Sequence, residues 1–109
     1  MDDISHVKGS RDIFLDLGFS PEEAENLSVK SASIGAIGDT IEARKLTRKA
    51  AAALCDTDQT TLSKVLRGRM ESVTIDRLTG WLTALGRTVE IRVRPFDRRV
   101  TEGHFIVSL

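Results

Sequence analysis

Residues 46–68 constrain the fold more than any other part of the chain, because they predict two short helices joined by a tight turn. Thr47 stands at the N-cap position of the first helix, ahead of a run of alanines with high helix propensity and small side chains. Residues 56–57 form the predicted turn, Asp58 caps the second helix and Gly68 ends it. The small side chains of the first helix allow the second to approach closely.

The second of these helices begins with small polar side chains, which suit a helix that enters the major groove of DNA. A glutamine can pair with adenine through two hydrogen bonds, a threonine methyl group can contact thymine, and a lysine can donate to guanine. The pattern is therefore that of a helix-turn-helix motif. It predicts base-contacting roles for Gln59, Thr60, Thr61, Ser63 and Lys64.

Basic and hydroxyl side chains flank this helix on both sides. At a helix start, free backbone amides add to the attraction that such side chains have for a phosphate. We therefore predict phosphate contacts for Thr47, Arg48, Lys49, Arg67 and Arg69. The alternatives are a helical pair whose polar faces are merely solvated, and an interaction module that has lost DNA binding.

The distribution of charge favours the DNA-binding interpretation, although the formal net charge of the chain is zero. Residues 1–30 carry three Lys or Arg against seven Asp or Glu, a net charge of −4. Residues 31–70 carry seven against four, a net of +3, and residues 71–109 carry six against five, a net of +1. The positive excess coincides with the predicted helical pair, where attraction to phosphate requires it.

Helices are also predicted on both sides of the helical pair. Ser20, Pro21 and Glu23 form a strong helix start, and apolar residues at spacings of three and four extend this helix to about residue 44. Two glycines weaken its middle, which predicts a bend or break near residues 31–35. A further helix is predicted over residues 75–85.

After the helices, the spacing of apolar residues changes to two. Val89, Ile91 and Val93 alternate with polar residues, which predicts a half-buried strand over residues 88–94. Residues 104–109 predict a second strand. Two strands alone are barely stable in water, so they must pack on the helices or pair with another chain.

The length of 109 residues fits a single domain with a modest core. We divide it into a flexible lead-in (1–11), a helix-turn-helix domain with a C-terminal strand (12–95) and an extension (96–109) with a possible second strand. No apolar run approaches the ~20 residues that a membrane-spanning helix needs. The acidic N-terminus lacks an apolar signal core, so we expect a cytoplasmic protein without a membrane partner.

The side chains that usually carry chemistry predict no catalytic, metal or cofactor site. Cys55 is the only cysteine, which excludes an internal disulfide, and a small core side chain is favoured over a redox switch. His6 and His104 stand far apart in the sequence, which disfavours a metal site. No motif places a base beside Ser63, so no enzyme activity is expected.

Three further features each have two interpretations. Trp81 is offset from the apolar stripe of its helix and is predicted to pack at the edge of the core, with a dimer interface as the alternative. If the turn that contains them is helical, Asp12 and Asp16 share a helix face, and solvated carboxylates or a contact with a protein partner are favoured over an acid/base pair. Residues 98–99, both arginine, form a solvated connection or contact phosphate.

Residues 13–95, about three quarters of the chain, resemble the lambda-repressor-like, Xre-type regulators and, more closely, the HigA-type antitoxins of bacterial toxin–antitoxin pairs. The resemblance lies in DLGFSPEEA (16–24), LT and AA (46–52), DQ, LS and LRG (58–68), and LTALGR with VEIRVRP (82–95). It implies a mainly α, lambda-repressor-like helix-turn-helix bundle, with one or two C-terminal strands used in dimerisation.

The resemblance also implies a function and partners. It implies a homodimer that represses its own promoter and neutralises a ribonuclease toxin of the RelE/HigB type. The acidic segment 1–30 is the candidate contact for such a basic toxin. The alternative is a stand-alone Xre-family regulator with no toxin partner.

The chain departs from the family pattern at three places. Arg48 replaces the glutamine that usually follows Leu-Thr, and it is still able to hold a phosphate. Asp56 replaces the usual turn glycine and tolerates a left-handed backbone less well than glycine, but better than most residues. Thr60 and Thr61 replace a common proline- or lysine-type pair, so the operator sequence of the family does not carry over.

Overall fold

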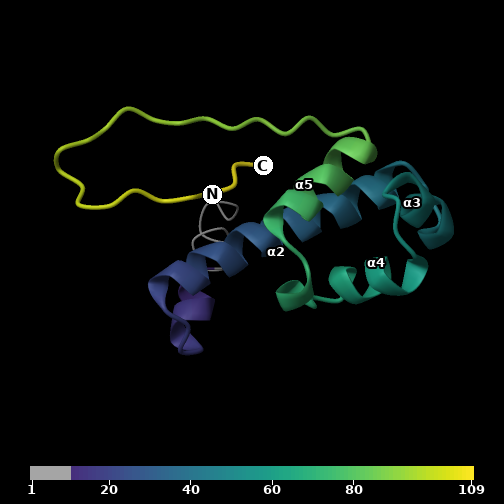
Figure 1. Cartoon of the computed structure of the whole chain (residues 1–109), viewed down its shortest axis with the longest axis horizontal. Coiled ribbons are helices and arrows are strands. Elements are labelled where there is room, and N and C mark those ends of the chain that lie inside the picture. Colours follow the sequence, from purple (N-terminus) through teal and green to yellow (C-terminus); the bar gives the residue numbers. More distant parts are fainter. Residues whose placement is uncertain (1–10) are drawn as a thin grey trace.

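A computed structural model of the chain describes residues 11–109. Residues 11–16 are helical, and in Figure 1 they lie at one end of a helical bundle. No residue in the range 11–109 belongs to a β-strand. The remaining helices are α2 (Pro21–Ala43), α3 (Arg48–Leu54), α4 (Gln59–Leu66), the 3-10 helix η1 (Met70–Ser72) and α5 (Ile75–Ala84).

The predicted mainly helical fold is therefore confirmed, with helix boundaries close to those expected. Most of the predicted lead-in, together with His6, lies outside the described residues. Arg11 is the exception, because it already belongs to the first described helix.

Helix starts were predictable because their caps are local. The Ser20 hydroxyl accepts a hydrogen bond from the Glu23 amide, and the Glu23 carboxylate accepts one from the Ser20 amide, both at 3.2 Å. Thr47, Asp58 and Thr74 each accept from the amide three residues ahead. Each cap satisfies an amide that the first helical turn leaves without a partner.

The turn between α3 and α4 places Asp56 in the left-handed region, with φ of 53°. Asp56→Gly is expected to raise the free energy of unfolding by about 0.5–1 kcal/mol, because relief of left-handed strain exceeds the added freedom of the unfolded chain. Urea unfolding followed by Trp81 fluorescence measures the change. Thr57→Gly is the matched control and is expected to destabilise, since Thr57 has no positive φ. Equal destabilisation by both variants would contradict this account of the turn.

Helix α2 runs without interruption through Gly35 and Gly38, so the predicted bend or break near residues 31–35 is wrong. Ile34, Ile37 and Ile41 lie along the same stretch and are all buried. Burial of three such side chains outweighs a glycine weakness of about 1 kcal/mol each. Tertiary packing therefore keeps this helix continuous where local propensity alone does not.

The core lies between α2 and the three later α-helices. Trp81 is only 3% exposed and belongs to this core, so the alternative that it faces a dimer interface is wrong. Cys55 is buried beside it, with its Sγ 3.9 Å from the Trp81 carbonyl oxygen, and burial raises the pKa of the Cys55 thiol. The predicted core role of Cys55 is thus confirmed. The largest fully buried side chains are Ile37, Leu62, Val65, Leu78 and Leu85.

Two arginines fix the end of α5 to α2. Arg44, the C-cap residue of α2, donates to the Leu85 carbonyl oxygen at 2.9 Å, which caps the C-terminus of α5. Arg87 donates to the Thr40 hydroxyl at 3.1 Å. These bonds set the position from which the rest of the chain leaves the bundle.

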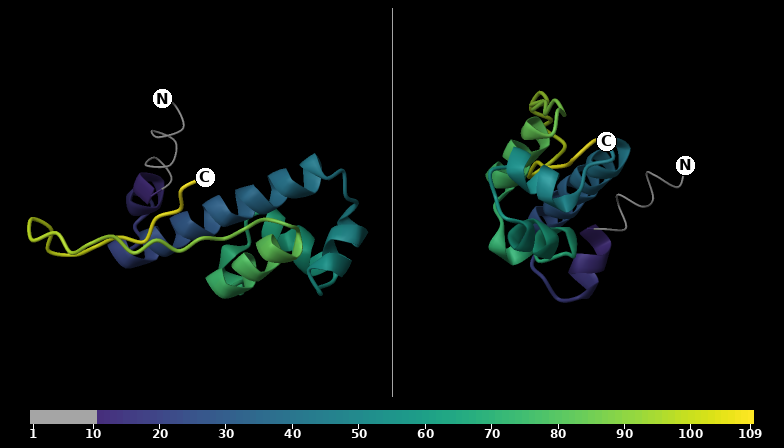
Figure 2. Two further views of the ribbon diagram at one scale, coloured as in Figure 1. Left: turned by 90° about the horizontal axis from the view of Figure 1, so that it is seen from above. Right: turned by 90° about the vertical axis from the view of Figure 1, so that its right-hand side faces the viewer.

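Residues 87–109 form an extended arm. The outgoing leg (residues 87–96) leaves α5, runs back along α2 and passes its N-terminal end (Figures 1 and 2). The returning leg (residues 104–109) follows the turn. Within the arm, the single backbone hydrogen bond runs from the Val100 amide to the Asp97 carbonyl oxygen, and none joins the two legs.

The predicted strands over residues 88–94 and 104–109 are therefore wrong for the single chain. Alternating side chains favour an extended backbone, and the arm is extended. A strand also requires a hydrogen-bonded neighbour, and neither leg supplies one to the other.

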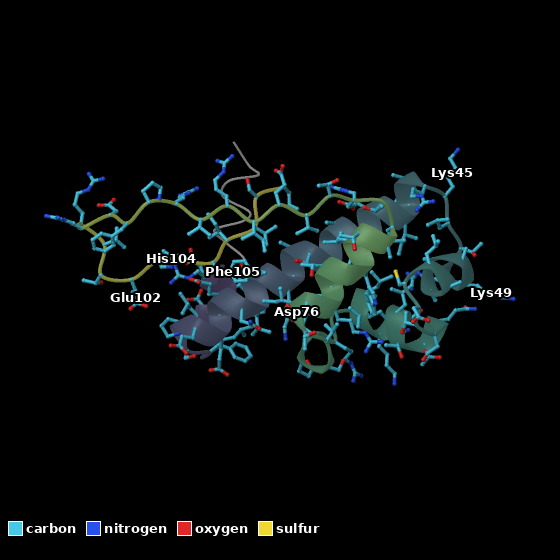
Figure 3. All side chains as sticks on the ribbon, turned by 45° about the horizontal axis from the view of Figure 1, so that its top comes forward. Lys45, Lys49, Asp76, Glu102, His104 and Phe105 are labelled. Carbon is cyan, nitrogen blue, oxygen red and sulfur yellow. The ribbon has the colours of Figure 1, made fainter. Side chains whose placement is uncertain are left out.

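Glu25 of α2 holds the returning leg. Its carboxylate accepts a hydrogen bond from the Phe105 amide and lies 2.9 Å from Nδ1 of His104 (Figure 3). Burial raises the pKa of Glu25, but the hydrogen bond from Phe105, the bond and charge of His104 and the charge of Arg11 together bring it below its ordinary value. The charged carboxylate is therefore the form that holds this leg.

Acidification is expected to release the returning leg. A lowered pKa means that docking is complete above the ordinary value of 4.5 and is lost as the pH falls through the lowered value. In an NMR titration, the Phe105 amide is expected to move to its random-coil position over that range. Glu25→Gln is expected to release the leg at neutral pH, whereas Glu23→Gln, which keeps the helix cap, leaves it docked. A Phe105 amide unchanged by Glu25→Gln would contradict the tether.

Candidate nucleic-acid interface

Helices α3 and α4 pack against each other at the end of the bundle away from the turn of the arm (Figure 1). Ala51 and Ala52 form the buried face of α3, and Leu62 and Val65 form that of α4. The small alanines allow close approach, as expected from the sequence. The pair is therefore a rigid platform, because caps fix its helix starts and the core holds its inner faces.

Three of the predicted base-contacting residues lie exposed on α4. They are Gln59 and Thr60 in its first turn and Lys64 one turn after Thr60. Within residues 11–109, no hydrogen bond or ion pair engages their side-chain polar groups. Their donors and acceptors are therefore available to an external ligand.

Thr61 has a different environment from its neighbours. Its hydroxyl donates to one Asp58 carboxylate oxygen at 3.0 Å, and its amide donates to the other at 2.7 Å. These two bonds hold the pKa of Asp58 below its ordinary value. The Thr61 hydroxyl thus serves the helix cap, and its methyl group is what remains for a base contact.

Ser63 and Arg48 are joined, although the sequence suggested separate roles for them. Nη1 of Arg48 donates to the Ser63 hydroxyl at 3.1 Å, which connects the start of α3 to the middle of α4. Ser63 is half-buried, while Arg48 is exposed and keeps further N–H groups for a phosphate. Arg48, which is predicted to contact a phosphate, therefore also orients the hydroxyl of Ser63, which is predicted to contact a base.

The other predicted phosphate-binding residues surround this platform. Thr47 accepts from the Ala50 amide at 3.0 Å, so its hydroxyl proton remains free to donate. Lys49 extends from this end of the molecule into solvent, opposite the end that carries His104 and Phe105 (Figure 3). Arg67 and Arg69 are exposed just past α4. The basic side chains thus lie at the start of α3 and just past the end of α4.

Arg77 is a further basic residue at this platform that sequence reasoning missed. It lies in the first turn of α5, and its Nη2 donates to the Thr57 hydroxyl at 3.4 Å. Its guanidinium carbon lies 5.5 Å from the centroid of the Trp81 ring. The spacing of four residues between an arginine and a tryptophan on one helix was the available signal. Arg77 places a positive charge beside the α3–α4 turn.

Other kinds of site receive no support from residues 11–109. No group of three or more His, Cys, Asp or Glu side chains there is arranged to hold a metal ion. No helix in the same range combines the length and apolar character needed to span a bilayer.

Comparison with known proteins agrees with this geometry. Residues 13–94 match the family described as "Helix-turn-helix domain". A solved structure titled "Putative XRE Family Transcriptional Regulator" superposes with a TM-score of 0.72 and 28% sequence identity, over 80% of this chain and 98% of that one. No curated protein matches the chain. The family match includes the outgoing leg of the arm through residue 94 and ends before the arm turns.

Proposed function

The chain belongs to this family of helix-turn-helix domains and is an XRE-type DNA-binding transcriptional regulator rather than an enzyme; on this premise we propose that it represses transcription by occupying promoter DNA as a homodimer. The observation that carries the proposal is the exposed face of α4. Gln59, Thr60 and Lys64 have no side-chain hydrogen-bonding partner among residues 11–109, and they lie on a helix that its cap and buried face hold in place. Such a helix can enter the major groove and exclude other proteins from the promoter.

The dimer is proposed because one reading helix contacts few base pairs. Two copies related by a two-fold axis read two half-sites separated by about 34 Å, one turn of the double helix. The outgoing leg of the arm supports this proposal, because its extended backbone has no hydrogen-bonded neighbour among residues 11–109 and so could pair with another chain. We assign this activity to the cytoplasm, where promoter DNA is accessible.

Selection from a pool of random DNA duplexes with the full-length protein tests the proposal. We expect enrichment of a palindromic sequence whose half-sites are separated by one helical turn or a multiple of it. Lys64→Glu combined with Arg67→Glu is the control, since both residues are exposed and the variant is expected to fold. Enrichment of the same sequence by this variant, or of no sequence by the natural protein, would contradict the assignment of α4.

We also propose a ribonuclease toxin of the RelE/HigB type as a second partner, on the strength of the HigA resemblance. Residues 11–16 offer a suitable surface for a basic protein. Asp12 and Asp16 are exposed, and Ile13 and Leu17 beside them are 58% and 68% exposed. Exposed acidic side chains next to exposed apolar ones complement a basic partner.

The toxin contact is testable without disturbing the bundle. Deleting residues 1–30 would cut through α2 and remove the buried Ala24 and Val29, so point substitutions are preferable. Asp12→Lys with Asp16→Lys is expected to reduce co-purification of the ribonuclease while leaving DNA binding intact, and Glu102→Lys serves as the control. Unchanged co-purification would reject the acidic contact. Absence of any adjacent RelE-like reading frame would favour a stand-alone regulator.

A further inference from the structure

Arg77 lies exposed in the first turn of α5, and its positive charge is not neutralised by a carboxylate. Within residues 11–109, its guanidinium group forms no ion pair. Its partners there are the Thr57 hydroxyl, 3.4 Å from Nη2, and the ring of Trp81, whose centroid lies 5.5 Å from the guanidinium carbon. A guanidinium group has five N–H donors, so most of them remain available to an external ligand.

The two contacts hold the guanidinium group in place without removing its charge. Trp81 is buried, so its ring is fixed in the core, and the face of an aromatic ring attracts a cation. The backbone of Arg77 is fixed as well, because its amide donates to the Thr74 hydroxyl that caps α5. A side chain ordered in this way loses little further conformational freedom when it binds an anion.

The position of Arg77 relative to α4 suits a contact with the DNA backbone. Thr57 directly precedes Asp58, the N-cap residue of α4, so Arg77 lies beside the end of the helix that enters the groove. The major groove is about 12 Å wide, and the phosphates line both of its edges. A cation beside the inserted helix is therefore placed at an edge of the groove, where the phosphates are.

We propose that Arg77 and Thr57 together bind one DNA phosphate next to the N-terminal end of α4. This proposal rests on the DNA binding in the proposed function and adds a phosphate subsite to it. The Thr57 hydroxyl accepts from Arg77, and no residue in the range 11–109 accepts its proton, so both side chains can donate to one phosphate. Their mutual bond is longer than the usual range of about 2.7–3.2 Å, and a charged phosphate oxygen is a stronger acceptor than a neutral hydroxyl.

This subsite is separate from the phosphate contacts predicted for other arginines. Arg48 reaches α4 at Ser63, in the second half of the helix, and Arg67 follows the last residue of α4. Arg77 instead reaches the turn that precedes α4, at the opposite end of the helix from Arg67. The three arginines therefore meet the DNA backbone at different phosphates.

Acidic residues around the turn increase the importance of this cation. Asp56 and Asp58 flank Thr57, and both are exposed. Asp76 is also exposed and precedes Arg77 in the first turn of α5 (Figure 3). Without Arg77, this side of the platform would present three carboxylates and would repel the DNA backbone.

Arg77→Gln tests the subsite in the full-length protein, because it removes the charge and keeps an amide that can bond the Thr57 hydroxyl. We expect binding to weaken about tenfold for the selected duplex and for an unrelated duplex alike, and the salt dependence of log K to fall by about 1. Fluorescence anisotropy over a series of salt concentrations measures both quantities. Arg98→Gln is the matched control: it removes one charge from an exposed residue in the turn of the arm, at the opposite end of the molecule, and is expected to change neither.

Two further variants separate the placement of the charge from the charge itself. Arg77→Lys keeps the charge but loses the planar fork, so we expect a salt dependence close to that of the natural protein with a weaker affinity. Thr57→Val removes the hydroxyl and is expected to weaken binding to both duplexes without removing a charge. Natural affinity in both variants would overturn the shared subsite.

A purely structural role for Arg77 predicts a different result. Arg77→Gln would then lower the stability to urea, through the lost contact with Trp81, and leave the salt dependence of DNA binding unchanged. That outcome would overturn the proposal. Weakening confined to the selected duplex would overturn it as well, because a phosphate contact acts on every sequence.

The unrelated duplex separates this subsite from the proposed function. If no sequence is selected but binding to the unrelated duplex depends on Arg77, promoter recognition fails and the subsite stands. If a sequence is selected and Arg77→Gln binds both duplexes as the natural protein does, the subsite fails and promoter recognition stands. A natural protein that binds neither duplex would overturn both.

Discussion

Leu62→Ala is expected to lower the free energy of unfolding by about 2–5 kcal/mol. Leu62 is fully buried in the middle of α4, in the core cluster that α2, α3 and α5 share. Truncation removes its apolar contacts and leaves a cavity that a short helix, packed on several sides, cannot close. Because small domains are stable by only about 5–15 kcal/mol, this one change removes a large part of the total.

Urea unfolding monitored through Trp81, the single tryptophan, measures this loss. Leu54→Ala is the matched control, since it deletes the same atoms from a side chain that is 45% exposed. A surface change of this kind is expected to alter stability by about 0.5 kcal/mol or less. Similar losses from both variants would show that α4 is not packed as described.

Gln59→Ala is expected to reduce discrimination between the selected DNA sequence and unrelated DNA by about 1–3 kcal/mol, or roughly 5- to 150-fold. Its side chain is exposed and has no hydrogen bond within residues 11–109, so truncation removes a base contact and little else. Fluorescence anisotropy with the two DNA duplexes at one salt concentration measures the change. Unfolding stability is expected to remain unchanged in the same variant.

Arg48→Ala is the control for Gln59→Ala. Loss of a phosphate contact is expected to weaken binding to all sequences alike and to reduce the salt dependence of log K by about 1. Since Arg48 also bonds Ser63, a smaller loss of discrimination is expected to accompany it. Equal weakening of both DNA duplexes by Gln59→Ala would show that Gln59 does not read a base.

The candidate site was largely predictable because a helix-turn-helix motif is encoded locally. Asp58 and Gly68 mark the ends of α4 through a cap and a left-handed residue, and both act within a few residues of their own position. The polar residues of α4 follow from helical periodicity once its buried face is known. The roles of Thr61 and Ser63 were less predictable, because their hydroxyl partners depend on side-chain geometry.

The parts that sequence reasoning misjudged all depend on distant contacts. Trp81 was expected at the edge of the core, yet its side chain is buried inside the core. It lies beside Cys55, which is 26 residues away in the chain. The bend expected in α2 does not occur, because its isoleucines pack on later helices. The Glu25 tether to residues 104–105 joins positions about 80 residues apart, which no local pattern reveals.

The sequence by itself determined where the helices begin and end, which residues of α4 are polar, and that residues 88–94 are extended, because caps and periodicity act between near neighbours in the chain. Only the tertiary structure decided that Arg48 supports Ser63, that Arg77 stands beside the turn, and that the two legs of the arm do not pair. Those outcomes depend on which distant groups meet in space, and hydrogen bonds form only where such groups come within about 3 Å of each other.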